Sequence, residues 1–372
     1  GGGSAAGSGG LVAVSGSVGL AIARNLIGAD TLFVPQTQET YAYIKNSDVI
    51  ASGDIGIEAE ASETIHADVF AGSVAIAVGI GAGIAGAGAT LINHIKSDVQ
   101  AYAEDSDLGA IGDIDVIATS SSDIARADAI GTAVSASLGA ASIAVSINQN
   151  TIENNVDAFI SSTGGDDNLI SADGTLDVIA DVTKARINAT AETASVSAGL
   201  VGLSGGGINI TNLVKNTVDA DIMGNLVVNV AGNSNDIEDN PAIQVKADEN
   251  THMTAEALSL AASFSLGAAV GASVISNTAD SDIEATITDA EVNAVGDGVN
   301  ASGDVLVLAN SDLLMDKTAT AGISASIGAG VTVNSANATV KNTVKAGIRG
   351  AEVTADNGTV TVEANAENDA WA

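Results

Sequence analysis

Hydrophobic and small or polar residues alternate with a period of two along most of this 372-residue chain. The stretch Ser73–Ile92, SVAIAVGIGAGIAGAGATLI, has no charge and no proline, and as a helix it would be long enough to cross a bilayer. Its large residues, such as Val74 and Ile76, take even positions, and Ala, Gly and Ser take the odd ones. A helix requires apolar residues three and four apart, and each glycine would destabilise it by roughly 1 kcal/mol. The pattern therefore predicts a β-strand, and neither a membrane helix nor a buried helix.

Runs of this kind, free of charge and alternating large with small residues, occur six times. They cover residues 11–23, 73–92, 133–147, 194–210, 258–275 and 322–333. A second marker, glycine followed by a polar and then an apolar residue, keeps the same order along the chain, as in GDIDVIA and GTLDVIA, although the copy PAIQVKA at Pro241–Ala247 has lost the glycine. Its first apolar residues lie 55 to 67 positions apart and are Ile55, Ile114, Leu176, Ile243, Val305 and Val360. The chain is therefore predicted to be one array of six units of about 60 residues, with approximate limits 1–68, 69–128, 129–192, 193–256, 257–317 and 318–372.

Short strands, small residues and a fixed repeat favour an all-β repeat fold, a β-solenoid or β-helix. With roughly 20 residues per coil, each unit would form three coils, and coils stacked about 4.8 Å apart would make a rod on the order of 85 Å long. Val, Ile, Leu and Ala are expected inside, and Asp, Asn and Thr outside. Residues 25–39 match no other unit and are interpreted as an insertion. Asn216, Asn277 and Asn342 would lie three coils apart, so we expect them to bond locally in turns and not to stack as a ladder.

The runs without charge pose a separate question, because a solvated outer face normally carries charges. Two interpretations remain open. Their flat face of small residues is covered by a second sheet of the same chain, or it is a lateral surface for other copies that gives fibres or a lattice. Open sheet edges at the ends of a rod also favour end-to-end pairing. Self-association or contact with other cell-surface components is therefore the expected kind of partnership.

The composition argues against some classes of binding partner. The formal net charge is −34, from 12 Lys and Arg against 46 Asp and Glu. This balance argues against nucleic acid and anionic membrane surfaces, which require basic patches. The chain has no cysteine, so disulfides and thiolate metal sites are excluded. The first residues, GGGSAAGSGG, have no basic region and are not interpreted as a signal peptide. We expect a processed terminus or an internal piece of a longer chain that does not span a membrane.

Calcium is the cofactor that the acidic turns favour, because Ca²⁺ takes six to eight oxygens from carboxylates and carbonyls. The repeat lacks the EF-hand loop and the calcium-binding nonapeptide, and solvated acidic turns are the alternative. The candidate ligands fall in three turn regions and are Asp166, Asp167 and Asp173, then Asp236, Glu238 and Asp239, then Asp297 and Asp304.

The order of these motifs resembles the repeats of very large bacterial surface proteins, the haemagglutinin-like and leukotoxin-like exoproteins secreted by autotransporter or two-partner routes. The resemblance rests on the GIGAGIAGAGA-like runs, on NTVDADI at 216–222, and on strands such as GTVTVEA at 358–364, and it covers nearly the whole chain except 25–39. It implies an extracellular β-solenoid at the bacterial surface, secreted, with a role in adhesion or surface structure. It implies no catalytic residues.

We therefore expect an extracellular structural or adhesive protein that forms a rod, fibre or surface layer through repeat stacking and uncharged strand faces. The first alternative is an adhesin module that binds a glycan or a host protein. The second is a polysaccharide-active β-helix enzyme, which would need clustered carboxylates and a basic residue such as Arg126 or Arg186. Enzymatic activity is not expected, because the three histidines lie singly and the basic residues are scattered.

Overall fold

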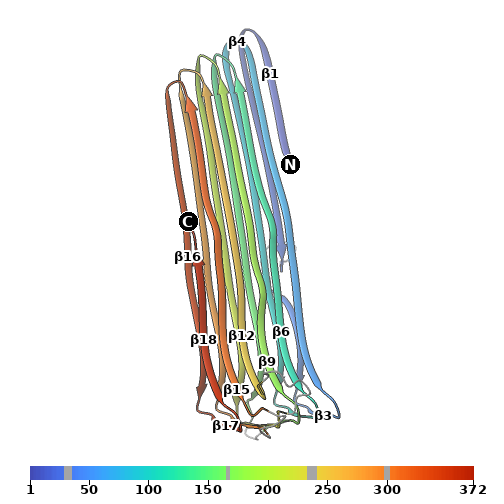
Figure 1. Ribbon diagram of the computed structural model, residues 1–372. Helices are drawn as coiled ribbons and strands as arrows, with labels where there is room; N and C mark the ends of the chain where they lie inside the picture. Colours follow the sequence, from blue (N-terminus) through green and yellow to red (C-terminus); the bar gives the residue numbers. More distant parts are fainter. Residues whose placement is uncertain (29–35, 165–167, 233–240, 297–301) are drawn as a thin grey trace.

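The computed structural model describes residues 1–28, 36–164, 168–232, 241–296 and 302–372, and within them it contains β-strands and no helix. The chain repeats one circuit: a long strand rises, turns over at a tip, returns as a second long strand, and crosses the base as a short strand (Figure 1). All of the strand pairs are parallel. The all-β prediction is confirmed, and the parallel pairing is consistent with a β-solenoid.

Three kinds of strand build the circuit, and we call them first arms, second arms and base strands. The first arms are β6 (Ile114–Ala136), β9 (Leu176–Ala198), β12 (Ile243–Phe264), β15 (Val305–Ser326) and β18 (Val360–Ala370). The second arms are β2 (Gln38–Lys45), β7 (Gly139–Ser162), β10 (Val201–Gly224), β13 (Ala268–Thr288) and β16 (Ala329–Arg349). Two strands, β1 (Gly2–Ile27) and β4 (Ile55–Glu104), pass over the tip without a break and supply both arms.

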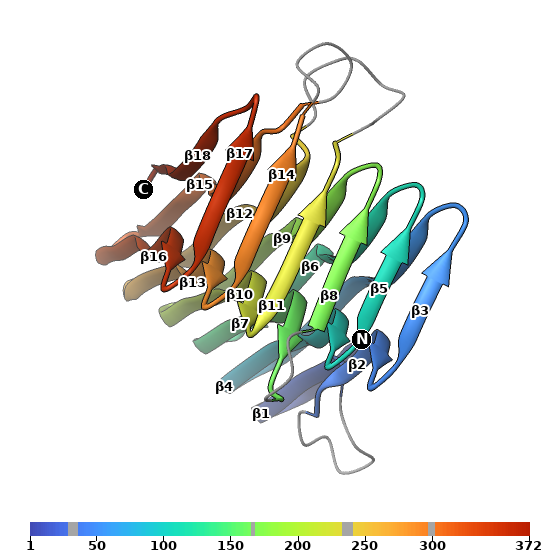
Figure 2. The same ribbon diagram turned by 90° about the horizontal axis from the view of Figure 1, so that it is seen from below.

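The base strands form a separate six-stranded sheet that closes the wide end of the circuits (Figure 2). They are β3 (Asp48–Ala51), β5 (Asp107–Ala110), β8 (Asn168–Ala172), β11 (Leu226–Val230), β14 (Glu291–Val295) and β17 (Glu352–Asp356). The stretch Ser73–Ile92 lies entirely within β4, so the prediction of strand over helix is confirmed there.

The register shows how long one circuit is. Ile114 pairs with Ile55 on one side and with Leu176 on the other, and Ile243 pairs with Val305. Partners are therefore about 60 residues apart, and the expected coil of 20 residues is wrong. A rod of 85 Å does not form either. The arms, at about 3.3 Å per residue, are about 75 Å long, and the stacking of the circuits extends only about 24 Å. Each circuit is therefore much longer along its strands than the stack of circuits is deep. The molecule is a slab whose longest dimension follows the strands.

Near the base, the interior is filled as the pattern predicts. Large side chains from all three walls meet there, including Ile114 and Val116 from a first arm, Ile152 and Val156 from a second arm, and Ile170 from the base. All five are fully buried. Parallel stacking repeats this layer in each circuit, because Val116 pairs with Val178 and so continues the same row. The hydrophobic effect thus stabilises the wide end of every circuit.

An asparagine ladder runs through the interior above this layer, which contradicts the expectation that asparagines do not stack. The Nδ2 of each residue donates to the Oδ1 of the next, at 2.8 Å from Asn25 to Asn93, 2.8 Å from Asn93 to Asn150, 2.8 Å from Asn150 to Asn212 and 2.9 Å from Asn212 to Asn277. The expectation was wrong because it placed three coils in each unit. With one circuit per unit, residues one repeat apart are direct neighbours.

A second buried polar layer lies close to the ladder. It centres on Glu249, whose side chain is only 2% exposed. Oε1 accepts hydrogen bonds from Asn216, Thr251 and Ser281, each at 2.7 Å, and Oε2 accepts one from Ser311 at 2.7 Å. A buried carboxylate needs such donors because it has lost its water. Asn216, which was expected in a turn, is one of them.

The ends of the segment 25–39 follow their neighbours. Asn25 to Ile27 continue β1 and pair with Asn93 to Ile95, and Gln38 and Glu39 begin β2. Residues 29–35 lie outside the described part of the chain.

Candidate functional surface

The arms change character about halfway to the tip. Asp, Glu, Lys and Arg are absent from one continuous stretch in each circuit, and these stretches are residues 1–23, 69–95, 129–152, 193–214, 257–279 and 318–340. Each stretch includes the upper part of a first arm, the tip and the upper part of a second arm. We call these six stretches together the distal half, and the remainder of the arms with the base strands the proximal half.

Toward the tips, small residues fill the interior of the distal half. Ser195 and Ser142, on facing arms, are buried and share a hydrogen bond of 2.8 Å between their hydroxyls. The two arms approach so closely that a Cβ added to Gly131 would lie 2.9 Å from the backbone oxygen of Val145, and one added to Gly19 would overlap that of Gly72. Large side chains do not fit between walls this close. The interpretation that the small-residue face is covered by the same chain is therefore the one the structure supports.

Toward the tips, the large aliphatic residues of the distal half point outward, which contradicts there the expectation that Val, Ile and Leu lie inside. Near the border with the proximal half, large residues such as Leu91, Ile152 and Ile210 are buried. The outward-pointing side chains, together with that of Phe264, cover the outer faces of both arms, and Leu203, for example, is 58% exposed. We call this surface the apolar crest, and define it as Leu11, Val12, Val14, Val18, Leu20, Ile22, Val74, Ile76, Val78, Ile80, Ile84, Val134, Leu138, Ile143, Val145, Leu200, Val201, Leu203, Leu258, Phe264, Leu266, Val270, Val274, Ile323, Ile327, Val331 and Val333.

An apolar crest of this extent is unusual, because contiguous exposed apolar patches on soluble monomers seldom exceed a few hundred Å² and larger ones mark interaction sites. A single exposed leucine needs no explanation, but rows of them on two faces do. The crest is therefore the strongest candidate for a functional surface in the described residues.

The apolar crest continues across the tips, at the end of the slab. Each tip has a leucine or isoleucine at its turn, and these residues are Leu11, Ile80, Leu138, Leu200, Leu266 and Ile327. Turns normally favour Gly, Asn, Asp and Ser. The turn amides also pair between circuits, since the N–H of Leu200 donates to the carbonyl of Leu138 at 3.0 Å and that of Leu266 donates to Leu200 at 3.1 Å. The strand ladder therefore continues around the tips, and these amides do not depend on water.

A border of charges separates the two halves. On the second arms, Lys96 pairs in register with Glu153, Glu153 with Lys215, and Asp280 with Lys341. Six of the twelve basic residues lie at or just below the border, and they are Arg24, Lys96, Arg126, Lys215, Lys317 and Lys341. The border therefore mixes both signs, whereas the rest of the proximal half is strongly acidic.

Carboxylates stack on the outer face of the proximal second arms. Asp157 pairs with Asp219, and Asp219 pairs with Glu284. Burial, followed by the nearby carboxylates, raises the pKa of Asp219 to about 7 and that of Asp157 to about 6. Beside them, the rings of Tyr43, Tyr102 and Phe159 stack at 5.2 and 4.8 Å between centroids. Stacked rings cover one another's faces, so they offer little flat surface to a sugar.

The two predicted calcium ligands that lie in the described residues, Asp173 and Asp304, are not brought together. Asp304 accepts hydrogen bonds from the backbone N–H of Thr359 at 2.6 Å and from the Ser302 hydroxyl at 2.6 Å, and these bonds hold its pKa below the usual range. Its oxygens thus join neighbouring circuits at the start of a first arm. Asp173 lies after β8 at the base. The other six candidates, Asp166, Asp167, Asp236, Glu238, Asp239 and Asp297, lie outside the described residues. Across the described ranges, no three Asp, Glu, His or Cys side chains cluster as a metal site would require.

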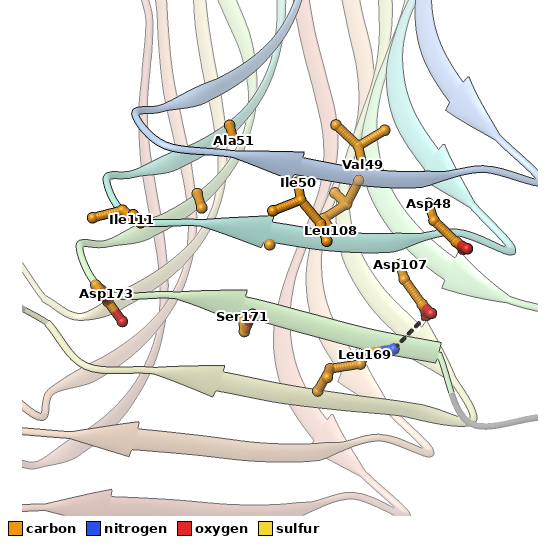
Figure 3. A pocket seen from close by; sticks show the side chains of 12 residues that line it. Asp48, Val49, Ile50, Ala51, Asp107, Leu108, Ile111, Leu169, Ser171 and Asp173 are labelled. Atoms are coloured by element: carbon orange, nitrogen blue, oxygen red, sulfur yellow. Dashed lines mark hydrogen bonds between the residues drawn. The ribbon is translucent and has the colours of Figure 1, made fainter.

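A shallow pocket of about 430 Å³ lies on the outer face of the base sheet (Figure 3). Its floor contains Ile50, Leu108 and Gly109, and carboxylates of Asp48 and Asp107 lie at one end with Asp173 at the other. The Asp107 carboxylate accepts a hydrogen bond from the N–H of Leu169 at 2.9 Å. The residues that line the pocket include no basic side chain and no histidine, so the pocket offers shape and negative charge but no positive group to hold an acidic substrate.

The two arginines proposed for an enzymatic groove are bound to neighbours. Arg186 pairs with Asp123 at 2.7 Å, and Arg126 lies 2.7 Å from Asp128 and 2.8 Å from Asp68. Arg186 is therefore paired with one carboxylate, and Arg126 with two.

No model of a known protein family, no curated protein and no solved structure matches this chain. Among the described residues, no helix is long and apolar enough to cross a membrane. Sequence reasoning found the charge-free runs but missed which of their faces is exposed. The signal available was the leucine or isoleucine at each tip, because a solvated turn would carry polar residues.

Proposed function

We propose that this chain is an extracellular structural or adhesive protein of the bacterial surface. It forms a six-unit β-solenoid that adheres through the apolar crest and lengthens by stacking circuit on circuit. The observation that carries this proposal is the crest, because a charge-free aliphatic surface on both faces of the slab needs a cover. The resemblance of the repeats to those of bacterial exoproteins supports the location.

Stacking at the ends has a separate physical basis. The outermost strands of the described array, such as β16 and β17, have one edge without a partner strand in the chain. Unpaired parallel edges are templates for another strand. A further circuit with the same register would extend the slab and cover those edges.

Sedimentation velocity and negative-stain imaging of the full chain test this function. We expect assemblies, seen as rods, fibres or sheets, which the double substitution Val201→Asp with Leu203→Asp reduces at least tenfold in apparent association constant. Both side chains point outward, so the fold should survive, as far-UV circular dichroism can check. Dispersed single particles of the unsubstituted protein, with no assembly on any surface, would contradict the proposal.

The pocket over β3, β5 and β8 favours one second candidate, a module that binds a glycan or host protein between acidic ends. Binding of a basic or hydroxyl-rich ligand that Ile50→Asp abolishes, with assembly unchanged, would support that candidate over the first.

A further inference from the structure

We infer that the apolar crest is covered by the hydrocarbon of a zwitterionic phospholipid layer, into which the distal half inserts edge first. This inference rests on the proposed function, because it takes the crest as the adhesive surface, and it names what the crest adheres to. Four features of the described residues favour lipid over a second copy of the chain.

The first feature is that the crest has two faces and an edge. Leu203 and Val270 lie on second arms, Leu258 and Val134 on first arms, and Leu200 at a tip, and all are exposed. A second copy packed on one face leaves the other face and the tips in water. A fluid hydrocarbon phase covers both faces and the tips together, which is the environment that maximises burial of apolar area.

The second feature is depth. On a first arm, eight residues separate Glu192 from Leu200, which is about 25 Å of strand. On the next second arm, nine residues separate Leu200 from Asn209, the first amide side chain pointing outward, which is about 30 Å. The hydrocarbon core of a bilayer is about 30 Å thick. The crest is therefore deep enough to use most of a bilayer's hydrocarbon.

The third feature is that the backbone of the distal half needs no water. Lipid excludes any chain whose amides and carbonyls lack partners. The ladder continues through the turns, where the N–H of Ala329 donates to Gly267 at 3.0 Å and the N–H of Ser137 donates to Ala198 at 3.0 Å. Inside, the hydroxyls of Ser142 and Ser195 bond to each other, whereas some other buried serine hydroxyls, such as that of Ser204, have no partner among the described residues. In the described part of the array, the open edges belong to the outermost strands, and the stacking proposed above covers those.

The fourth feature is charge. Two copies side by side with their tips aligned would bring two strongly acidic proximal halves together, and the chain carries −34. Neutral hydrocarbon brings no such repulsion. The border row, with Lys96, Glu153 and Lys215 in register, presents alternating signs at the level where zwitterionic headgroups would lie. The acidic proximal half disfavours anionic lipid, which is why the inference specifies a zwitterionic layer.

Flotation with phosphatidylcholine vesicles tests the inference. The full chain should float with vesicles, and the double substitution Leu200→Asp with Leu266→Asp should reduce the vesicle-bound fraction at least tenfold. A matched control substitutes two large residues that are exposed in the proximal half and lie outside the pocket, Tyr43→Asp with Val295→Asp, and should change binding less than twofold. Circular dichroism of each variant checks that the fold is intact.

Insertion depth gives a second readout. The chain has no cysteine, so Leu200→Cys places a single fluorophore at a tip and Asn229→Cys places one on the base sheet. With vesicles of brominated phosphatidylcholine, the tip probe should be quenched by lipids brominated deep in the chain, and the base probe should not change.

The remaining outcomes each decide the matter. Flotation without deep quenching of the tip would overturn insertion. No flotation, together with lipid-free assembly that Leu200→Asp with Leu266→Asp prevents, would show that a second copy covers the crest; lipid would be wrong and the proposed function would stand. Dispersed particles that neither float nor assemble would overturn both.

Discussion

Large and small or polar residues alternate in both the proximal and the distal half of each circuit, but the large residues are buried in one half and, toward the tips, exposed in the other. In the proximal half, Val178 is buried and its neighbour Asp177 lies on the outer side. In the distal half, Ser204 is buried and its neighbour Leu203 is exposed. A single arm therefore turns its large residues inward near the base and outward near the tip.

The number of walls explains the difference. In the proximal half a base strand holds the two arms apart, and the triangular space between three walls accepts isoleucine and leucine (Figure 2). Toward the tips the two arms face each other directly, and a close approach such as that at Gly131 leaves room for small residues such as Gly, Ala and Ser. Geometry thus decides which residues are inside, and burial of the excluded aliphatic residues is left to a partner. The hydrophobic effect determines the core only where there is room for it.

The largest effect is expected at the junction of the halves. Glu249→Ala would leave four buried donors, those of Asn216, Thr251, Ser281 and Ser311, without their acceptor. We expect the free energy of unfolding to fall by about 3 kcal/mol, as denaturant titration can measure. Glu249→Gln keeps one acceptor oxygen and should cost about 1 kcal/mol. Equal losses for the two variants would show that this hydrogen-bond layer does not hold the halves together.

Widening the distal interior should have the next largest effect. A Cβ at Gly206 would lie 2.7 Å from the Ser259 hydroxyl and 3.0 Å from that of Thr193, so Gly206→Val should destabilise the protein by about 2 kcal/mol through overpacking. Gly205 is the matched control, because it faces outward and its Cβ would have nothing closer than 3.9 Å. Gly205→Val should change stability by less than about 0.5 kcal/mol. Thermal unfolding compares the two, and similar losses would contradict the tight distal interior.

The acidic face of the proximal half predicts a pH dependence. The pKa of Asp219 is raised to about 7, so the native state holds this proton more tightly than the unfolded chain does. The resulting stabilisation is complete below the unfolded pKa near 4 and is lost as the pH rises through about 7. We expect stability to fall by about 1 kcal/mol between pH 5 and pH 8, after allowance for solvent screening. Asp219→Asn should flatten the profile, and a midpoint that rises from pH 5 to pH 8 would contradict this origin.

The smallest effect on stability is expected on the crest itself. Leu266 is exposed to water, so Leu266→Asp removes little packing against the rest of the protein. The free energy of unfolding of the dispersed protein should change by less than about 0.5 kcal/mol. A loss of several kcal/mol in denaturant titration would mean that Leu266 packs inside, against the inversion of the two halves.

Strand content and the repeat markers could be read from the sequence because a period of two needs only local residues. Ile55, Ile114 and Leu176 were aligned as markers, and they are register partners in the sheet. The direction of the distal side chains could not be read in the same way. Without charges on either face, hydropathy places valine inside, and only the distance between two walls reverses that assignment. The asparagine ladder was missed for a similar reason, although Asn150 and Asn212 are 62 residues apart, one full repeat.

The calcium hypothesis shows a different limit. Acidic turn residues share one composition whether they bind a cation or bond to the next circuit, and Asp304 does the latter with Thr359. Only the register of the stack distinguishes these roles.

The inversion between the halves can be measured most directly by thiol labelling, because the chain has no cysteine of its own. Single variants Leu203→Cys and Ser204→Cys sample the distal half, and Asp177→Cys and Val178→Cys sample the proximal half. In the dispersed protein, we expect Leu203→Cys to react at least tenfold faster than Ser204→Cys, and Asp177→Cys at least tenfold faster than Val178→Cys. The large residue is thus the reactive site near the tip and the protected one near the base. Protection of position 203 with rapid labelling of position 204 would contradict the account.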